Sequence, residues 1–321
     1  MRRSGGVRGG KAQRVPPSAV DGMNTVPRSP FRAGLIGRGI QASLTPAMHM
    51  AEGQAQGFDY RYDLLDLDRL ADGEAHLSDL VADAQDRGFG GLNVTHPCKQ
   101  AVIPFVDTLS EDAAALGAIN TIVLRDGRRE GHNTDWWGFA ESFRRGLPGA
   151  DLASVVQLGA GGAGAATAYA ILSLGAAHLS IFDRDQARAE ALAENMQTHF
   201  PRAVVGGGRD LAKAMADASG LIHATPTGMS KYPGLPLEAD LLRPALWVAE
   251  IVYFPLTTEL LAEACRRGCR VLDGGGMAVF QAVKAFHLFT GIEPDAERMR
   301  RHFADLTGAS GTPGVAAGVG G

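Results

Sequence analysis

A glycine-rich segment at residues 159–164 has the composition and position expected of a site for a ligand phosphate. It follows an apolar segment, 155–158, and precedes an alanine-rich segment, 165–174, an order typical of a strand, a tight turn and a helix. A second apolar segment, 179–182, ends at Asp183. Glycine lets a pyrophosphate approach the N-terminus of a helix, where unpaired N–H groups and the helix dipole favour an anion. The segment and the acid together predict a dinucleotide site.

Four polar clusters outside this segment stand at predicted turns. Taken singly, each fits an ordinary helix cap, strand end or turn, because Ser, Thr, Asn and Asp favour such positions for local reasons. Only their combination and order along the chain is informative. The clusters are Ser-Leu-Thr-Pro at 43–46, Asn-Val-Thr-His-Pro-Cys-Lys at 93–99, Gly-Ala-Ile-Asn-Thr at 117–121 and Asn-Thr-Asp at 133–135.

With three further motifs and the glycine segment, these clusters resemble the shikimate dehydrogenase family from about residue 32 to residue 291. The resemblance implies an α/β substrate domain, built from both ends of the chain, around a Rossmann-like parallel-sheet domain. It also implies reversible oxidation of a ring hydroxyl on shikimate or a relative. The further motifs are Ala-Thr-Pro-Thr-Gly-Met at 224–229, Val-Tyr-Phe-Pro at 252–255 and Gly-Met-Ala-Val-Phe-Gln-Ala at 276–282.

The resemblance assigns the acid–base chemistry to Lys99 and Asp135. An ammonium on Lys99 can donate to a ketone oxygen during reduction, and the amine can take the hydroxyl proton during oxidation. The implied substrate is a small polyhydroxylated acid: quinate, shikimate or their 3-dehydro forms. The implied substrate-binding residues are Ser43 and Thr45 for the carboxylate, Thr95, Asn120 and Gln281 for the ring hydroxyls, and Tyr253 near the substrate and the nicotinamide.

The segment after the second nucleotide-domain strand distinguishes NAD from NADP. Typical biosynthetic members carry Asn-Arg-Thr there, whose arginine binds the 2′-phosphate, whereas this chain has Asp183-Arg184-Asp185. Asp183 can accept hydrogen bonds from both ribose hydroxyls and repels a 2′-phosphate, while Asp185 offers Arg184 a local partner. We therefore expect NAD. The expected cofactor-binding residues are Gly159, Ala160, Gly161, Gly162, Ala163, Gly164, Asp183, Arg188, Thr225, Pro226, Val252 and Gly275.

The leading hypothesis is thus an NAD-dependent quinate/shikimate dehydrogenase. Thr45, where serine is more usual in the family, points the same way. Three alternatives stay open: an NADP-dependent biosynthetic shikimate dehydrogenase, a non-catalytic ligand-sensing homologue, and a remote α/β dehydrogenase with another substrate. The presence of both Lys99 and Asp135 disfavours the sensor. The sequence does not decide between quinate and shikimate, or the physiological direction.

Composition limits the partners. The 321 residues carry a formal net charge of −4, which does not indicate a nucleic-acid partner. No apolar run approaches the ~18 residues of a membrane span. The three cysteines and nine histidines form no metal-binding spacing, and we expect a reducing, cytoplasmic location. A homodimer is compatible with these features.

Alternating apolar segments predict a two-domain α/β protein. We expect the substrate domain at 32–134 plus 275–307, the dinucleotide-binding domain at 135–274, and disordered tails at 1–31 and 308–321. Helix 277–288 should pack back on the first domain. Predicted strands of the first domain are 32–37, 58–62, 91–95 and 121–124, with helices at 47–56, 77–87, 102–108 and 112–116. The nucleotide domain follows a linker helix, 135–144, with strands at 155–158, 179–182, 203–205, 220–223, 246–250 and 270–272.

Overall fold

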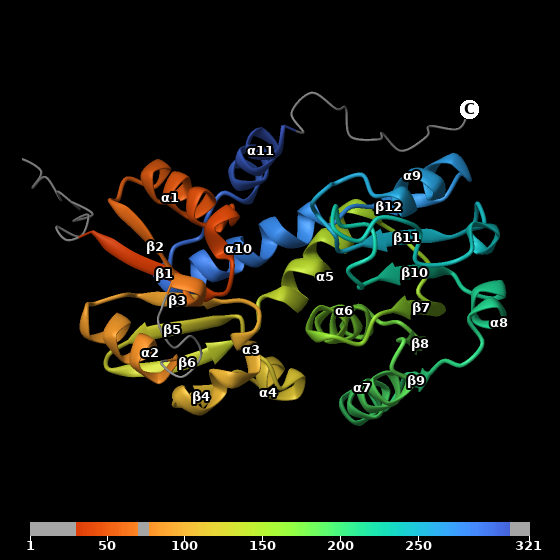
Figure 1. The fold of residues 1–321 in the computed structure, drawn as a ribbon, viewed down its shortest axis with the longest axis horizontal. Coiled ribbons are helices and arrows are strands. Elements are labelled where there is room, and N and C mark those ends of the chain that lie inside the picture. The colour runs from red at the N-terminus through yellow and green to blue at the C-terminus, as the bar shows by residue number, and fades with distance from the viewer. Residues whose placement is uncertain (1–29, 70–76, 309–321) are drawn as a thin grey trace, which may run out of the picture.

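The computed structural model describes residues 30–69 and 77–308, which form two α/β lobes joined by long helices (Figure 1). The first lobe holds a mixed six-stranded sheet in the order β2-β1-β3-β5-β6-β4. Strands β2, β1 and β3 run parallel, and β5 pairs antiparallel with both β3 and β6. The strands are β1 (Phe31–Gly37), β2 (Tyr60–Asp66), β3 (Gly91–Val94), β4 (Thr108–Leu109), β5 (Thr121–Arg125) and β6 (Arg128–His132).

Helices cover the first sheet, and two predicted elements differ from the observed ones. The predicted helix 102–108 is wrong: Pro104 lacks a backbone N–H, and the segment forms a 3-10 turn, Ile103–Phe105, followed by β4. Strand β2 runs four residues beyond its predicted end, because β1 continues to Gly37 and pairs with β2 as far as Asp66. The helices are α1 (Thr45–Ala55), α2 (Leu77–Asp86), α3 (Cys98–Ala101) and α4 (Glu111–Leu116).

The second lobe is the predicted parallel sheet with a Rossmann-like order, β12-β11-β10-β7-β8-β9. The strand order reverses between β7 and β10, which is where open parallel sheets bind ligands, outside the carboxyl ends of the strands. Its strands are β7 (Ser154–Leu158), β8 (His178–Phe182), β9 (Val204–Gly207), β10 (Gly220–His223), β11 (Trp247–Glu250) and β12 (Arg270–Leu272). Its helices are α6 (Gly162–Ser173), α7 (Gln186–His199), α8 (Leu211–Ala216) and α9 (Glu259–Arg266).

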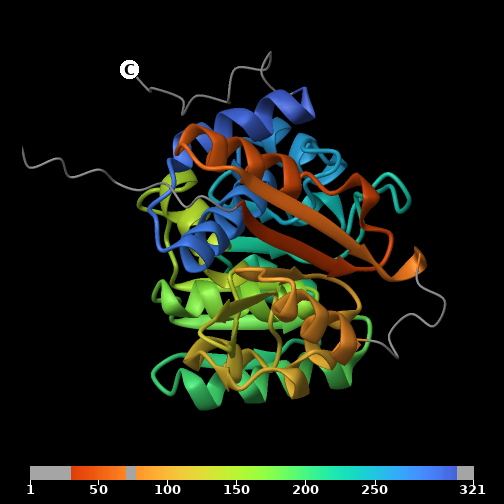
Figure 2. The same ribbon diagram turned by 90° about the vertical axis from the view of Figure 1, so that its left-hand side faces the viewer.

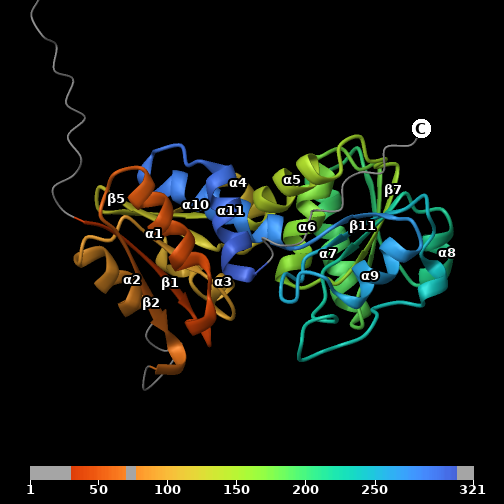
Figure 3. The same cartoon turned by 90° about the horizontal axis from the view of Figure 1, so that it is seen from above.

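Helices α5 (Asp135–Gly146) and α10 (Gly275–Thr290) lie between the lobes and pack closely against each other (Figures 1 and 3). Figure 2 views the molecule from the side of the first lobe, with the second lobe behind it. Close packing depends on glycine, because a Cβ at Gly138 would lie 2.7 Å from the Gln281 nitrogen. As expected, α10 returns to the first lobe: Phe286 and Phe289 join a buried cluster with Tyr60 of β2. The two-domain α/β prediction is confirmed.

The last helix, α11 (Ala296–Thr307), is held to α1 by a buried carboxylate. Glu52 accepts two hydrogen bonds from the Arg298 guanidinium, at 2.7 and 2.8 Å. The predicted tails lie outside the described residues except at their inner ends, where Phe31 already belongs to β1. None of the helices within 30–69 and 77–308 combines the length and apolar character needed to cross a bilayer.

Candidate active site

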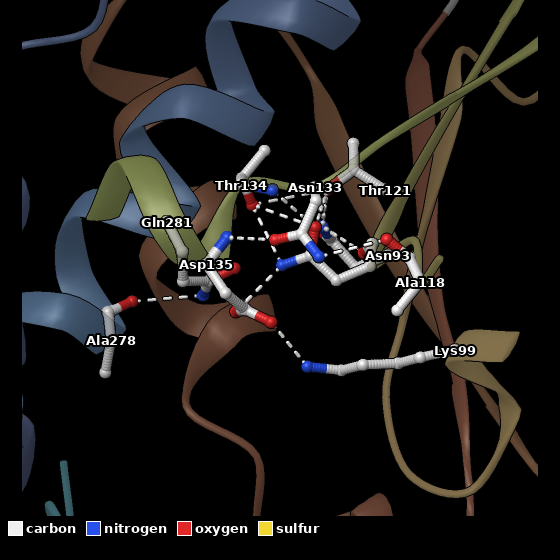
Figure 4. A network of polar contacts seen from close by, with 10 residues as sticks. Asn93, Lys99, Ala118, Thr121, Asn133, Thr134, Asp135, Ala278 and Gln281 are labelled. Carbon is white, nitrogen blue, oxygen red and sulfur yellow. Dashed lines mark hydrogen bonds and ion pairs between the residues drawn. The ribbon is translucent and has the colours of Figure 1, made fainter. Parts of the chain in front are cut away.

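The predicted catalytic residues meet. Lys99 Nζ donates to Asp135 Oδ2 at 2.5 Å, although the two residues are far apart in the sequence and come from different helices, α3 and α5 (Figure 4). The Lys99 side chain keeps 27% of its surface exposed and that of Asp135 keeps 12%, so the pair is accessible to a ligand but mostly shielded from water. The Lys99 ammonium and the Asp135 carboxylate are therefore in direct contact at a place that a ligand can reach.

Local backbone geometry fixes both side chains. The chain turns sharply after β3, where the Cys98 nitrogen donates to the Thr95 oxygen at 2.9 Å and starts α3. The carbonyl of Lys99 accepts from the Ile119 nitrogen at 2.9 Å, which ties α3 to the segment before β5. Asp135 is the first residue of α5, where the helix dipole stabilises a carboxylate.

Asn120 holds Asp135 in place. Its Nδ2 donates to Asp135 Oδ1 at 2.9 Å and to Thr134 Oγ1 at 3.0 Å, while its Oδ1 accepts from the Thr134 nitrogen at 2.7 Å. The side chain is buried. The amide that we predicted to bind a ring hydroxyl thus orients the Asp135 carboxylate in this structure, and its direct contact with a substrate stays a prediction.

A second layer of polar residues, which sequence reasoning did not single out, supports Asn120. Asn93 Nδ2 donates to the Asn120 carbonyl and to Thr121 Oγ1, and Asn93 Oδ1 accepts from the Tyr62 hydroxyl at 2.8 Å. Asn93, Thr121 and Thr134 belong to the motifs at 93–99, 117–121 and 133–135, and this membership was the only indication in the sequence that they support the site. Tyr62 carries no such signal, because only the pairing of β2 with β1 brings it there.

The predicted carboxylate-binding residues lie at the start of α1. Ser43 Oγ accepts from the Thr45 nitrogen at 3.3 Å, and both residues are partly buried. Thr95 stands where β3 ends, and its nitrogen donates to the Ile36 oxygen of β1 at 2.9 Å. Hydroxyl groups therefore follow the ends of neighbouring parallel strands.

Tyr253 and Gln281 come from the second lobe and from α10. The protein atoms packed around part of Tyr253 raise its pKa by desolvation, the nearby Lys99 lowers it, and Asp135 raises it, so the phenol lies within electrostatic reach of the Lys99–Asp135 pair. About half of the Tyr253 side chain is exposed. Gln281 stands on α10, where its Nε2 donates to the Ala278 carbonyl at 3.0 Å (Figure 4), and its backbone nitrogen packs against Gly138 of α5.

The glycine-rich segment has the shape needed for a dinucleotide. Gly159 has φ +105°, and a Cβ there would lie 2.4 Å from the Ala224 oxygen, so the turn itself requires glycine. A Cβ at Gly161 or Gly162 would meet nothing within 4 Å, which leaves open space in front of the first turn of α6. Gly161 is the N-cap and offers the helix no side-chain cap. A pyrophosphate can supply the missing acceptors there.

Asp183 supports the same turn from β8. Its Oδ2 accepts from the Ala160 nitrogen at 2.8 Å and its Oδ1 from the Asp185 nitrogen at 3.0 Å. A carboxylate has about four lone-pair positions, so acceptor capacity remains for ribose hydroxyls. Our expectation that Asp185 partners Arg184 is wrong: Asp185 caps α7 and lies 3.6 Å from Arg188 Nε, and that arginine is exposed.

The remaining predicted cofactor residues surround the carboxyl ends of β10 and β11. Thr225 touches the glycine turn, since its Cγ2 would lie 3.2 Å from a Cβ at Gly159, and Pro226 beside it is exposed. Val252 is buried directly after β11, and Gly275 is buried at the start of α10. Within the described part of the chain, no three His, Cys, Asp or Glu side chains are grouped as metal ligands.

Comparison with known proteins identifies the family. Residues 35–122 match the shikimate dehydrogenase substrate-binding domain, and residues 274–302 match the shikimate 5′-dehydrogenase C-terminal domain. A shikimate dehydrogenase (NADP(+)) of Streptomyces avermitilis is 57% identical over 282 residues, covering 87% of this chain and 97% of that protein. A quinate/shikimate dehydrogenase (NAD(+)) of Corynebacterium efficiens is 50% identical over 277 residues, covering 85% of this chain and 97% of the relative.

Solved structures agree. Quinate dehydrogenase from Corynebacterium glutamicum in complex with NAD superposes with a TM-score of 0.83 and 46% identity, covering 86% of this chain and all of that one. The Lys99–Asp135 pair, the glycine turn and these similarities over most of the chain have one explanation: the protein belongs to the shikimate dehydrogenase family.

Proposed function

We propose that this protein is an NAD-dependent quinate/shikimate dehydrogenase that interconverts the ring alcohol and its 3-dehydro ketone. The observation that carries the proposal is the contact between Lys99 Nζ and Asp135 Oδ2 in a partly shielded site. Such a contact supplies the proton transfer that a hydroxyl needs when it becomes a ketone. The bound nicotinamide supplies the hydride acceptor in oxidation and the donor in reduction.

Lys99 serves as the acid and base. In the reducing direction its ammonium donates a proton to the ketone oxygen and stabilises the negative charge that develops there. In the oxidising direction the neutral amine accepts the hydroxyl proton. Asp135, held by Asn120 and by the N-terminus of α5, keeps the lysine head group aimed at that oxygen.

The substrate pocket combines hydroxyl groups with the catalytic pair. The hydroxyl groups of Ser43 and Thr45, at the start of α1, donate hydrogen bonds to the substrate carboxylate. Thr95 and Gln281 form hydrogen bonds with the ring hydroxyls. Tyr253 approaches from the second lobe. A small acid with several hydroxyls suits this set, because a site of fixed polar groups rejects ligands that leave those groups unpaired.

The preference for NAD rests on Asp183. A 2′-phosphate beside its carboxylate would lose the ribose hydrogen bond and create a like-charge contact, which together cost several kcal/mol. The Corynebacterium relatives named for NAD support this choice. The Streptomyces relative named for NADP, which is more similar in sequence, favours a second candidate: a biosynthetic shikimate dehydrogenase that uses NADP.

A steady-state matrix tests the proposal, with quinate and shikimate each offered with NAD and NADP. We expect the larger kcat/KM with NAD for both acids. Asp183→Asn should weaken NAD use and relax the preference. Asp185→Asn is the matched control, because it removes a neighbouring charge while asparagine still caps α7.

Three outcomes would overturn parts of the proposal. A wild-type preference for NADP would support the second candidate, the NADP-dependent biosynthetic shikimate dehydrogenase. An unchanged preference in Asp183→Asn shows that another residue selects the cofactor. Ligand binding without turnover of either acid would indicate the non-catalytic sensor instead.

A further inference from the structure

A second buried polar pair lies behind the predicted cofactor site, at the carboxyl ends of two neighbouring strands. His223 ends β10 and Glu250 ends β11, and the two residues are paired across the parallel ladder. His223 Nδ1 lies 2.9 Å from both Glu250 oxygens. Both side chains are fully buried. Neither residue belongs to the acid–base mechanism described above.

The hydrogen-bonding roles in this pair are determined by its neighbours. Glu250 also accepts from the nitrogens of Ile251 and Val252, at 2.9 and 3.0 Å, and from the Thr258 hydroxyl at 3.1 Å. The backbone nitrogens can only donate, so the carboxyl group is an acceptor toward the following loop. His223 Nδ1 therefore carries a hydrogen and donates to Glu250.

A gain in folding stability does not by itself explain why His223 and Glu250 are buried together. Replacing buried ionic groups with well-packed apolar residues is often neutral or stabilising, because desolvation offsets much of the attraction. What the pair does provide is geometry. It connects β10, β11 and the N-cap of α9 through directional contacts.

One end of the pair reaches the glycine turn. His223 Nε2 lies 2.5 Å from Thr225 Oγ1, which also accepts from the Thr227 nitrogen at 3.3 Å. The methyl group of Thr225 lies against Gly159, where a Cβ would be 3.2 Å away. The imidazole thus fixes one rotamer of a threonine beside the turn that a pyrophosphate would approach.

The other end of the pair fixes the loop that follows β11. Glu250 fixes the backbone of Ile251 and Val252, and the next residue is Tyr253. The carbonyls of Ile251 and Val252 lie against Gly274, the N-cap of α10, where a Cβ would collide with both, and α10 packs on α5, which begins at Asp135. His223 and Glu250 therefore connect the glycine turn to the loop that packs on the start of α10 and carries Tyr253.

We propose that His223 and Glu250 are positioning residues for the dinucleotide: they hold the Thr225 hydroxyl and the Val252–Tyr253 backbone so that the cofactor is seated between the glycine turn and Lys99. The inference rests on the dinucleotide binding proposed above. It predicts that the pair contributes to cofactor affinity through Thr225, and to turnover through the loop that carries Tyr253.

The first test uses His223→Asn. The asparagine amide can occupy the position of Nδ1 and keep the contact with Glu250, but it cannot reach Thr225. We expect the Kd for NADH, measured by fluorescence titration without substrate, to rise about tenfold, the equivalent of one lost hydrogen bond. Thr225→Val should give a similar rise, and the double variant should bind no more weakly than the weaker single variant.

The second test concerns the other end. Glu250→Gln keeps the size of the side chain but leaves fewer acceptor positions for the loop nitrogens and Nδ1. We expect lower kcat in addition to weaker NADH binding. His49→Gln is the control: His49 is a buried histidine of the first lobe that bonds the Tyr60 hydroxyl, and its replacement should leave the Kd for NADH unchanged even where Tm falls.

The outcomes separate the two proposals. If the wild type binds neither NADH nor NADPH, the proposed function fails. If the wild type binds NADH while folded His223→Asn binds it equally well, only the positioning role is overturned, and the pair is purely structural. Should His223→Asn fail to fold, Thr225→Val decides alone, and wild-type affinity in that variant overturns the inference.

Discussion

Removing the Lys99 ammonium is the most direct perturbation of the proposed acid–base pair. Lys99→Met keeps an unbranched side chain of similar length in α3 but deletes the donor that lies 2.5 Å from Asp135 Oδ2. Asp135 keeps its hydrogen bond from Asn120 and its place at the start of α5. The substitution therefore removes the proton donor while most of its surroundings stay in place.

The expected loss of turnover follows from this geometry. A positioned acid or base contributes roughly 10²–10⁴ in rate, which corresponds to about 3–5 kcal/mol of activation free energy. Because the pair is mostly shielded from water, its loss should lower Tm, while the hydrogen bond from Asn120 keeps Asp135 in place and the fold intact. We therefore expect a folded protein with normal cofactor affinity and a severely reduced kcat.

The assay is initial-rate oxidation of shikimate and of quinate, followed by NADH absorbance, with Tm and the Kd for NADH measured in parallel. Lys213→Met is the matched control, because Lys213 is an exposed lysine on α8 in the second lobe. The reasoning is refuted if folded Lys99→Met turns over within about threefold of wild type.

Three further predictions concern the pocket, its supporting network and the core. Ser43→Ala and Thr45→Val should each raise KM for both acids, by the roughly 1–3 kcal/mol of a lost donor to a charged group; unchanged KM values would remove these residues from the carboxylate site. Asn120→Ala should lower kcat more than it raises KM and should lower Tm, because it frees Asp135 and leaves the buried Thr134 nitrogen unpaired. Burial lowers the pKa of His49 from 6.5 to about 3, so its contribution to stability is complete above pH 6.5 and is lost as pH falls toward 3. The unfolding free energy of His49→Gln, from urea melts, should therefore decline less over that range than that of wild type.

Local sequence patterns predicted the second lobe well. Its central strands, β7, β10 and β11, are short, mostly apolar segments that are almost fully buried, and such segments are visible without knowledge of their neighbours. The errors in the first lobe have non-local or specific causes. The strand predicted at 58–62 continues to Asp66, because the adjacent strand β1 pairs with it as far as Gly37. Pro104 interrupts an apolar pattern that otherwise indicates a helix.

The site was predictable as a set of residues but not as a network. The motifs named Lys99, Asp135 and Asn120, yet nothing in their spacing says that the Asn120 amide donates to Asp135. That contact depends on the antiparallel pairing of β5 with β6, which brings Asn120 beside Thr134. Likewise, His223 and Glu250 are 27 positions apart, and only the parallel ladder makes them neighbours.

The packing of α5 against α10 explains why both ends of the chain are needed for one site. A Cβ at Gly138 would lie 2.7 Å from the Gln281 nitrogen and 2.8 Å from the Met277 oxygen, and these backbone atoms cannot move without shifting α10. Asp135 begins α5 one turn before Gly138, so the same contact sets the separation between Asp135 and Gln281. Because α10 is also buried against the first lobe through Phe286 and Phe289, that separation is fixed by the core. The position of Gln281 relative to the acid–base pair is therefore determined by a glycine and by aromatic packing, rather than by any contact with a ligand.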